Sequence, residues 1–237
     1  MKLSTKIKAW AHDYLYMLYG VMAGIVYITP HRPHSYASHL SKNPVVILPG
    51  VFNKWGFMKK MVNELHRLGH PVYVVPKLGY NLHTIPHSAN LVTEVIEENN
   101  LKNVILIGHS KGGLIGKYIL CHNTTKGKVI GMISIATPYS GSEMTKVLPI
   151  APLKELHTTS QIIKDLQLHV DVNKKIISII PEYDNHVWSE EGSYLEGAKN
   201  IHVPVHGHHK IVFDREVIAS VVSSITEIGS LYSISTK

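Results

Sequence analysis

The stretch Val-Ile-Leu-Ile-Gly-His-Ser-Lys-Gly-Gly at residues 104–113 decides the fold of this chain. Its first four residues are apolar and predict a short buried strand, and the pattern that follows it predicts a helix. Gly108 and Gly112 let the backbones of strand and helix approach more closely than a Cβ atom would permit. We therefore expect a sharp turn that presents Ser110 at the end of the strand, beside the free N–H groups of the helix.

Outward from this turn, apolar runs and helical patterns alternate from residue 43 onward. The expected strands are residues 45–48, 72–75, 104–107, 129–135, 175–180 and 201–205, and the helices are 55–68, 86–99, the segment after Ser110, and 213–228. Continuous apolar strands separated by helices are typical of a parallel sheet covered on both faces. The predicted fold class is α/β: a doubly wound, mostly parallel sheet of about six strands, with candidate sites at the carboxyl ends of the strands.

Residues 139–173 interrupt this alternation. The interval contains two prolines, Pro149 and Pro152, and a helical pattern near residues 161–168. An insertion at this point follows the fourth expected strand, so it would lie over the edge of the sheet where sites form. We expect a small lid there.

The N-terminal segment, residues 1–42, differs from the main domain expected at 43–237. Residues 14–28 carry no charge, but this run of about 15 residues is short for a membrane span and lacks a small-residue cleavage site. We expect a buried or interfacial helix, with residues 10–28 as a candidate for peripheral membrane contact. An uncleaved membrane anchor is the alternative. The segment favours a cytoplasmic or membrane-associated location over secretion.

Composition narrows the class further. The chain has 237 residues, 44% of them hydrophobic and 17% charged, which suits one globular domain besides the N-terminal segment. The net charge is +7, but the lysines are scattered and form no arginine-rich or aromatic-interleaved stripe. We therefore expect no nucleic-acid partner and a basic surface suited at most to anionic membranes. The single cysteine, Cys121, excludes an intramolecular disulfide and is expected to pack as a small apolar residue.

Seventeen histidines raise the question of a metal site. Two groups are close in sequence: His31, His34 and His39, and His206, His208 and His209. Neither group has the cysteine or carboxylate spacing of a known zinc site. We therefore expect no metal and no other cofactor.

The serine at position 110 needs a base within hydrogen-bond reach, and that base needs a group that fixes its tautomer. Asp184, just beyond the fifth expected strand, is the candidate acid, with Glu182 as its competitor. His208 follows the last expected strand and is the candidate base, because the apolar trio beginning three residues later would bury the next helix beneath it. His209 is the alternative base.

Two backbone N–H groups are candidates for an oxyanion hole, those of Lys111 and Val51. Lys111 directly follows Ser110, and Val51 lies in the loop after the first strand, with Phe52 as second choice. Each such donor typically contributes about 2.7–4 kcal/mol to transition-state stabilisation. The Lys111 ammonium has two open interpretations. In the first, the ammonium stabilises the developing oxyanion or binds an anionic group of the substrate. In the second, it forms a surface ion pair with a carboxylate of the expected lid, such as Glu143.

Taken together, these motifs resemble the α/β-hydrolase superfamily, in its small bacterial lipase and esterase branch. The similar segments are Pro-Val-Val-Ile-Leu-Pro-Gly at 44–50, Gly-His-Ser-Lys-Gly-Gly-Leu at 108–114, Ala-Thr-Pro-Tyr-Ser-Gly-Ser at 136–142, Asp-Asn-His-Val at 184–187 and Gly-His-His-Lys-Ile-Val-Phe-Asp at 207–214. They extend over about residues 44–228. The chain departs from many relatives at Pro49 and Tyr139, where histidine is frequent.

The resemblance implies a serine hydrolase that cleaves carboxylic esters, with a small-molecule ester or a lipid as substrate. Ser110 would be the nucleophile, Asp184 the acid and His208 the base, in the chain order that is typical of the superfamily. One alternative is an acyltransferase or thioesterase that uses the same triad. A non-catalytic binding protein with this fold is the other.

Overall fold

The structure is a computed structural model that describes residues 3–26, 42–146, 150–188 and 192–235. The histidines at positions 31, 34 and 39 lie outside the described residues.

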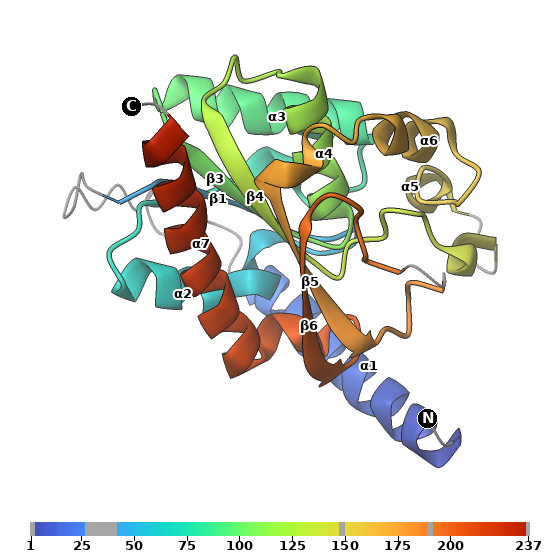
Figure 1. The fold of residues 1–237 in the computed structure, drawn as a ribbon. Coiled ribbons are helices and arrows are strands. Elements are labelled where there is room, and N and C mark those ends of the chain that lie inside the picture. The colour runs from blue at the N-terminus through green and yellow to red at the C-terminus, as the bar shows by residue number, and fades with distance from the viewer. Residues whose placement is uncertain (1–2, 27–41, 147–149, 189–191, 236–237) are drawn as a thin grey trace.

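A six-stranded sheet forms the centre of the molecule (Figure 1). Its strands are β1 (Val45–Leu48), β2 (Val72–Val74), β3 (Val104–His109), β4 (Val129–Ile135), β5 (Ile176–Tyr183) and β6 (Lys199–His206). They lie in the order β2-β1-β3-β4-β5-β6, and every neighbouring pair is parallel. The predicted α/β fold class is therefore confirmed. β5 runs three residues past its expected end at Ile180, which brings its last residue next to Asp184.

Helices cover both faces of the sheet (Figure 1). They are α1 (Leu3–Val26), α2 (Lys59–Arg67), α3 (Ile85–Glu98), α4 (Lys111–His122), α5 (Ala151–Lys154), α6 (Gln161–Leu168) and α7 (Arg215–Ser235). Alternate residues of β1 show the two layers. Val45 and Ile47 pack into a core shared with α2 and α7, whereas Val46 and Leu48 pack into a core shared with α3 and α4.

The expected insertion after β4 contains the 3-10 helix Glu143–Lys146, α5 and α6. Ile163 and Leu166 of α6 are buried in the core that α3 and α4 share. That this insertion acts as a lid stays a prediction.

The N-terminal helix α1 packs against the short 3-10 helices Trp55–Met58 and Lys210–Phe213 (Figure 1). The contact is close, because a Cβ atom on Gly20 would lie 1.9 Å from the Phe57 ring. None of the helices in the described part of the chain combines the length and the hydropathy that a membrane span needs. The division of the chain at residue 42 stays a prediction.

Candidate active site

The turn between β3 and α4 holds Ser110 in a strained conformation. Its backbone has φ 53° and ψ −122°, values that non-glycine residues rarely adopt. Strand β3, helix α4 and the end of β1 approach one another very closely around this turn, and they can do so only because positions 108 and 112 are glycines. A Cβ atom on Gly108 would lie 2.5 Å from the backbone of Gly112, and one on Gly112 would lie 2.1 Å from the Leu48 carbonyl oxygen. The strand and helix are thus packed as closely as the sequence predicts, with Ser110 at the tip of the turn.

His208 and Asp184 form a buried hydrogen-bonded pair beyond the carboxyl ends of β6 and β5. Nδ1 of His208 lies 2.8 Å from Oδ2 of Asp184. The other carboxylate oxygen of Asp184 accepts the N–H groups of His186 and Val187, at 2.8 and 2.9 Å. The aspartate is therefore fixed on both of its oxygens. Glu182, the other candidate acid, is exposed instead, and its Oε2 lies 3.2 Å from Nε2 of His206.

Burial and charge act in opposite directions on this pair. Burial would raise the pKa of Asp184, but the charge and hydrogen bond of His208 outweigh it and hold that pKa below its usual value. Burial would lower the pKa of His208, but the charge and hydrogen bond of Asp184 outweigh it, so the pKa of His208 is raised. The geometry therefore stabilises an imidazolium at position 208.

The main chain of His208 is held as firmly as its ring. Its N–H donates to Oδ1 of Asn185 at 3.0 Å, and its carbonyl lies 2.8 Å from Nε2 of His109. His109 is fully buried and stacks on the Phe57 ring at 5.4 Å. Burial and the neighbouring histidines hold the pKa of His109 well below its usual value, so the ring is neutral and its Nε2–H donates. His109, the residue before Ser110, thus supports the loop of His208, a role that the sequence pattern does not indicate.

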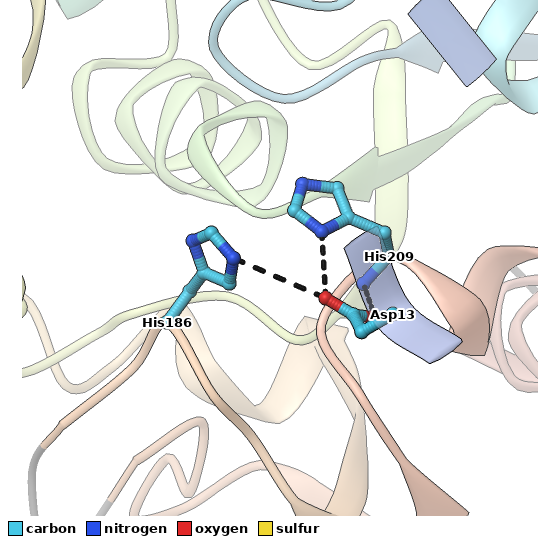
Figure 2. Close-up of side chains that lie close together, drawn as sticks. All are labelled: Asp13, His186 and His209. Carbon is cyan, nitrogen blue, oxygen red and sulfur yellow. Dashed lines mark hydrogen bonds and ion pairs between the residues drawn. The ribbon is translucent and has the colours of Figure 1, made fainter. Parts of the chain in front are cut away.

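A second aspartate–histidine pair is formed by Asp13 and His209 (Figure 2). It lies beside the first pair, with the ring centroids of His209 and His208 5.2 Å apart, and the sequence pattern does not indicate it. Asp13 of α1 is completely buried, and its Oδ2 lies 2.8 Å from Nδ1 of His209. His209 was the alternative base, but the structure pairs its ring with Asp13 instead of Asp184. The only hint in the sequence was an isolated acid inside an apolar helix, which does not indicate a partner 196 residues away.

His186 completes this group of rings. It stacks on His208 at 5.0 Å, and its Nε2 lies 3.9 Å from Oδ2 of Asp13 (Figure 2). Burial and the charges of His208 and His209 lower the pKa of His186 to about 3, so the ring is neutral at neutral pH.

Metal-ligating atoms of Asp13, His186 and His209 lie within 4.8 Å of one another, as do those of a second group, His122, Asp165 and His169. In the first group, Asp13 already accepts three N–H groups, two of them from the main chain. A cation there would have to replace the hydrogen bond between Asp13 and His209. The observed contacts are those of a hydrogen-bonded cluster.

A pocket of about 420 Å³ opens over the turn. Ser110 and His208 both line it, and the rest of its wall is mainly apolar. The wall residues come from α1 (Tyr14, Met17 and Val21), from the loop after β1 (Gly50, Val51, Phe52 and Asn53) and from the insertion after β4 (Met144, Thr145, Leu153 and Leu156). In the described part of the chain, no hydrogen bond joins the Ser110 hydroxyl to the His208 ring. Such bonds commonly form only when substrate is bound.

The two expected oxyanion donors flank Ser110. Lys111 is the first residue of α4, so its N–H has no partner within the helix. Val51 follows Gly50, where a Cβ atom would lie 3.1 Å from Cβ of Ser110. Phe52, the second choice, has a left-handed backbone with φ 62°. The loop after β1 is thus in contact with the serine.

The structure contradicts the surface ion pair predicted between Lys111 and Glu143. The ammonium is completely buried and donates to the carbonyls of Asn81 and His83 in the loop before α3. Glu143 instead pairs with Lys146. Burial lowers the pKa of Lys111 to about 8. The side chain therefore fastens that loop to α4, which the sequence could not indicate because the partners are main-chain oxygens.

Comparison with known proteins adds a family-model match and a set of similar structures. Residues 79–186 match a model described as a PGAP1-like alpha/beta domain. No curated protein sequence matches the chain. The solved structures of similar fold include lipase B of Aspergillus fumigatus, at 18% identity and a TM-score of 0.67 over 82% of this chain. The aligned part of this chain covers 55% of that lipase, so the chain spans about half of the lipase's length.

Two further structures are similar over most of their own length. The mature lipase BlEst2 of Bacillus licheniformis has 14% identity and a TM-score of 0.63, covering 79% of this chain and 93% of that one. The monoacylglycerol lipase of Paleococcus ferrophilus has 15% identity and a TM-score of 0.57, covering 79% and 96%. At such identities the likeness concerns the fold.

Proposed function

Because this chain has the α/β-hydrolase fold, we propose that it is a serine hydrolase that cleaves carboxylic esters through Ser110, His208 and Asp184. The observation that carries the proposal is the buried Asp184–His208 pair, whose histidine lines one pocket together with a serine held in a strained turn. Structural neighbours that are lipases support the same class of activity.

The proposed reaction has two halves. His208 takes the proton of the Ser110 hydroxyl as the oxygen attacks the ester carbonyl, and Asp184 stabilises the imidazolium that forms. The N–H groups of Val51 and Lys111 would stabilise the negative oxygen of the tetrahedral intermediate. His208 then returns the proton to the departing alcohol. In the second half, water attacks the acyl carbon with His208 again as base, and the bond between the acyl carbon and the Ser110 oxygen breaks. His208 returns the proton to Ser110, and the carboxylic acid leaves.

The apolar wall of the pocket favours an apolar acyl group. Met17, Val21, Met144, Leu153 and Leu156 would surround the acyl chain. Burying such a chain gains roughly 0.8 kcal/mol per methylene group. We therefore expect kcat/KM to rise with acyl length until about 420 Å³ is filled.

A panel of p-nitrophenyl esters, with a fluorophosphonate probe, tests the activity. The wild-type protein should hydrolyse the esters and be labelled, and Ser110→Ala should lose both properties. Ser223→Ala, which removes an exposed hydroxyl on α7, is the matched control and should behave as wild type. Ester hydrolysis that survives in Ser110→Ala would refute the proposal. A competing alcohol that captures most of the acyl group would instead indicate an acyltransferase.

We also propose that α1 rests on an anionic lipid surface that presents the substrate. Leu15, Leu18 and Tyr19 are 63%, 57% and 63% exposed, and α1 has no exposed acidic side chain. Lysines at positions 59 and 60 line a hollow beside Tyr19, so cations flank the apolar face. Exposed apolar side chains with flanking lysines favour an anionic interface. Because α1 also forms one wall of the pocket, a lipid would reach the pocket directly.

Sedimentation with vesicles tests this surface. The wild-type protein should bind vesicles of phosphatidylcholine with phosphatidylglycerol more strongly than phosphatidylcholine alone, and salt should weaken the binding. The double variant Leu15→Gln with Leu18→Gln should lose most of it. Leu168→Gln, which changes a leucine that is 79% exposed on α6, is the control. If the double variant instead converts a dimer to a monomer without changing vesicle binding, the face is a contact between copies and the lipid proposal is wrong.

A further inference from the structure

The carboxylate of Asp13 contacts the loop of His208 at several points. Oδ1 accepts the N–H groups of His209 and Lys210, at 2.7 and 2.9 Å. Oδ2 accepts from Nδ1 of His209 at 2.8 Å, and Figure 2 shows this pair. Asp13 is the only acidic residue in α1, and none of its surface is exposed. An ionised carboxylate is buried at low cost only when its oxygens are hydrogen-bonded, as they are here.

Gly207, the residue before His208, packs directly against the same carboxylate. Gly207 has φ +129°, and a Cβ atom there would lie 2.4 Å from Oδ1 of Asp13. A side chain at position 207 would therefore push α1 and the loop apart. Asp13 thus touches the loop both before and after His208, although it does not bond to His208 itself.

The remaining contacts of His208 come from other elements. Asp184 binds its ring, Asn185 accepts its N–H and His109 donates to its carbonyl. None of these groups reaches the main chain of residues 209–210, which Asp13 holds. We infer that Asp13 is a positioning residue for His208, by which the N-terminal helix sets the place of the catalytic base. The inference rests on the proposed function of His208.

The charge of Asp13 gives this role an electrostatic signature. Among the described residues, five titratable groups face His208. They are Asp13 from α1, His109 from β3, Asp184 and His186 from the loop after β5, and His209 from the loop after β6. Burial would raise the pKa of Asp13, but its hydrogen bonds and the charge of His209 outweigh it and hold that pKa well below the usual range, so Asp13 is ionised. Its charge adds to that of Asp184 in raising the pKa of His208. Neutralising Asp13 should therefore lower the pKa of His208.

Asp13→Asn separates the charge from the packing. The amide has the shape of the carboxylate, its oxygen can still accept both main-chain N–H groups, and His209 can accept from the amide in its other tautomer. We expect kcat to fall about tenfold with KM nearly unchanged, and the acid limb of the pH profile to move to lower pH. Asp13→Ala, which also removes the hydrogen bonds, should lower kcat by about 10²-fold.

Glu182→Gln is the matched control, since it neutralises an exposed carboxylate on β5 whose partner is His206. It should leave kcat and the acid limb unchanged. The second measurement is the titration of His208 by ¹⁵N-histidine NMR, assigned with His208→Gln, and it requires no turnover. In Asp13→Asn the His208 signal should titrate at lower pH than in wild type.

Two results would overturn the inference: an unchanged His208 titration in Asp13→Asn, or a folded Asp13→Ala protein with the wild-type kcat and acid limb. If the proposed function itself is wrong, the two measurements give a different combination of results. The wild-type protein would then cleave no ester, while the NMR titration would still report whether Asp13 acts on His208. A shift in that titration supports the inference in either case.

Discussion

The Asp184 carboxylate accepts the Nδ1–H of His208 at 2.8 Å, with its second oxygen bound to two main-chain N–H groups. The aspartate therefore cannot rotate away without breaking three hydrogen bonds. It fixes the tautomer in which Nε2 of His208 is free to accept a proton. This relationship determines how the proposed site should respond to substitution and to pH.

Asp184→Asn should lower kcat by about 10⁴-fold, with KM little changed. The amide can donate to Nδ1 and so hold His208 in the tautomer that cannot take the Ser110 proton, an effect of this size in other triads. Steady-state kinetics on the best ester of the panel would measure it. Glu182→Gln should retain full activity. A tenfold or smaller loss in Asp184→Asn would mean that Asp184 does not orient the base.

The pH dependence of kcat/KM should show an acid limb with its midpoint above 6.5. His208 acts as a base only when it is neutral, so activity rises as pH increases through its pKa. That pKa is raised, because Asp184 outweighs the effect of burial. In Asp184→Asn the residual activity should show its midpoint at lower pH. A wild-type midpoint well below 6.5 would contradict the charge balance inferred for the pair.

The sequence was sufficient for the parts of the molecule that depend on local pattern. All six strands appear close to their expected bounds, because continuous apolar runs between helices leave few other arrangements. The turn at Ser110 was predictable because glycines at fixed spacing are its direct cause. Asp184 and His208 were candidates because each follows a strand, and the structure brings them together.

The contacts that depend on tertiary structure were not predictable. Asp13 and His109 support the loop of His208 from α1 and β3, and nothing in the local pattern at either position indicates which main-chain groups it meets. The partners of the Lys111 side chain were not predictable for a related reason. A lysine next to a proposed nucleophile suggests chemistry or a surface ion pair, whereas its partners are the carbonyls of a loop about 30 residues earlier.

Gly112→Ala should destabilise the fold by more than about 2 kcal/mol, because overpacking against backbone cannot relax by a rotamer change. The new Cβ atom would lie 2.1 Å from the Leu48 carbonyl oxygen. Gly127→Ala is the control, with φ +78° but nothing within 4 Å of the added atom, and should cost only about 1 kcal/mol. Urea unfolding measures both free energies. Equal losses would show that the close approach of α4 to β1 does not limit stability.

Lys111→Met should change how stability depends on pH. The pKa of Lys111 is about 8 in the folded protein, because of burial, against an ordinary value of 10.5 in the unfolded chain. Between these two values the unfolded chain binds a proton that the folded protein does not. The free energy of unfolding of wild type should therefore increase with pH relative to the variant, by on the order of 3 kcal/mol over this range.

Below pH 8 the lysine is protonated in both states, so the difference between the two proteins should be constant there. At pH 7 the variant leaves the carbonyls of Asn81 and His83 without their donor, so part of the gain from removing a buried charge is lost. Urea unfolding between pH 7 and 10.5 gives the two curves. Lys174→Met, on an exposed lysine, is the control and should follow wild type. Parallel curves for wild type and Lys111→Met would show that the folded protein does not lower the pKa of Lys111.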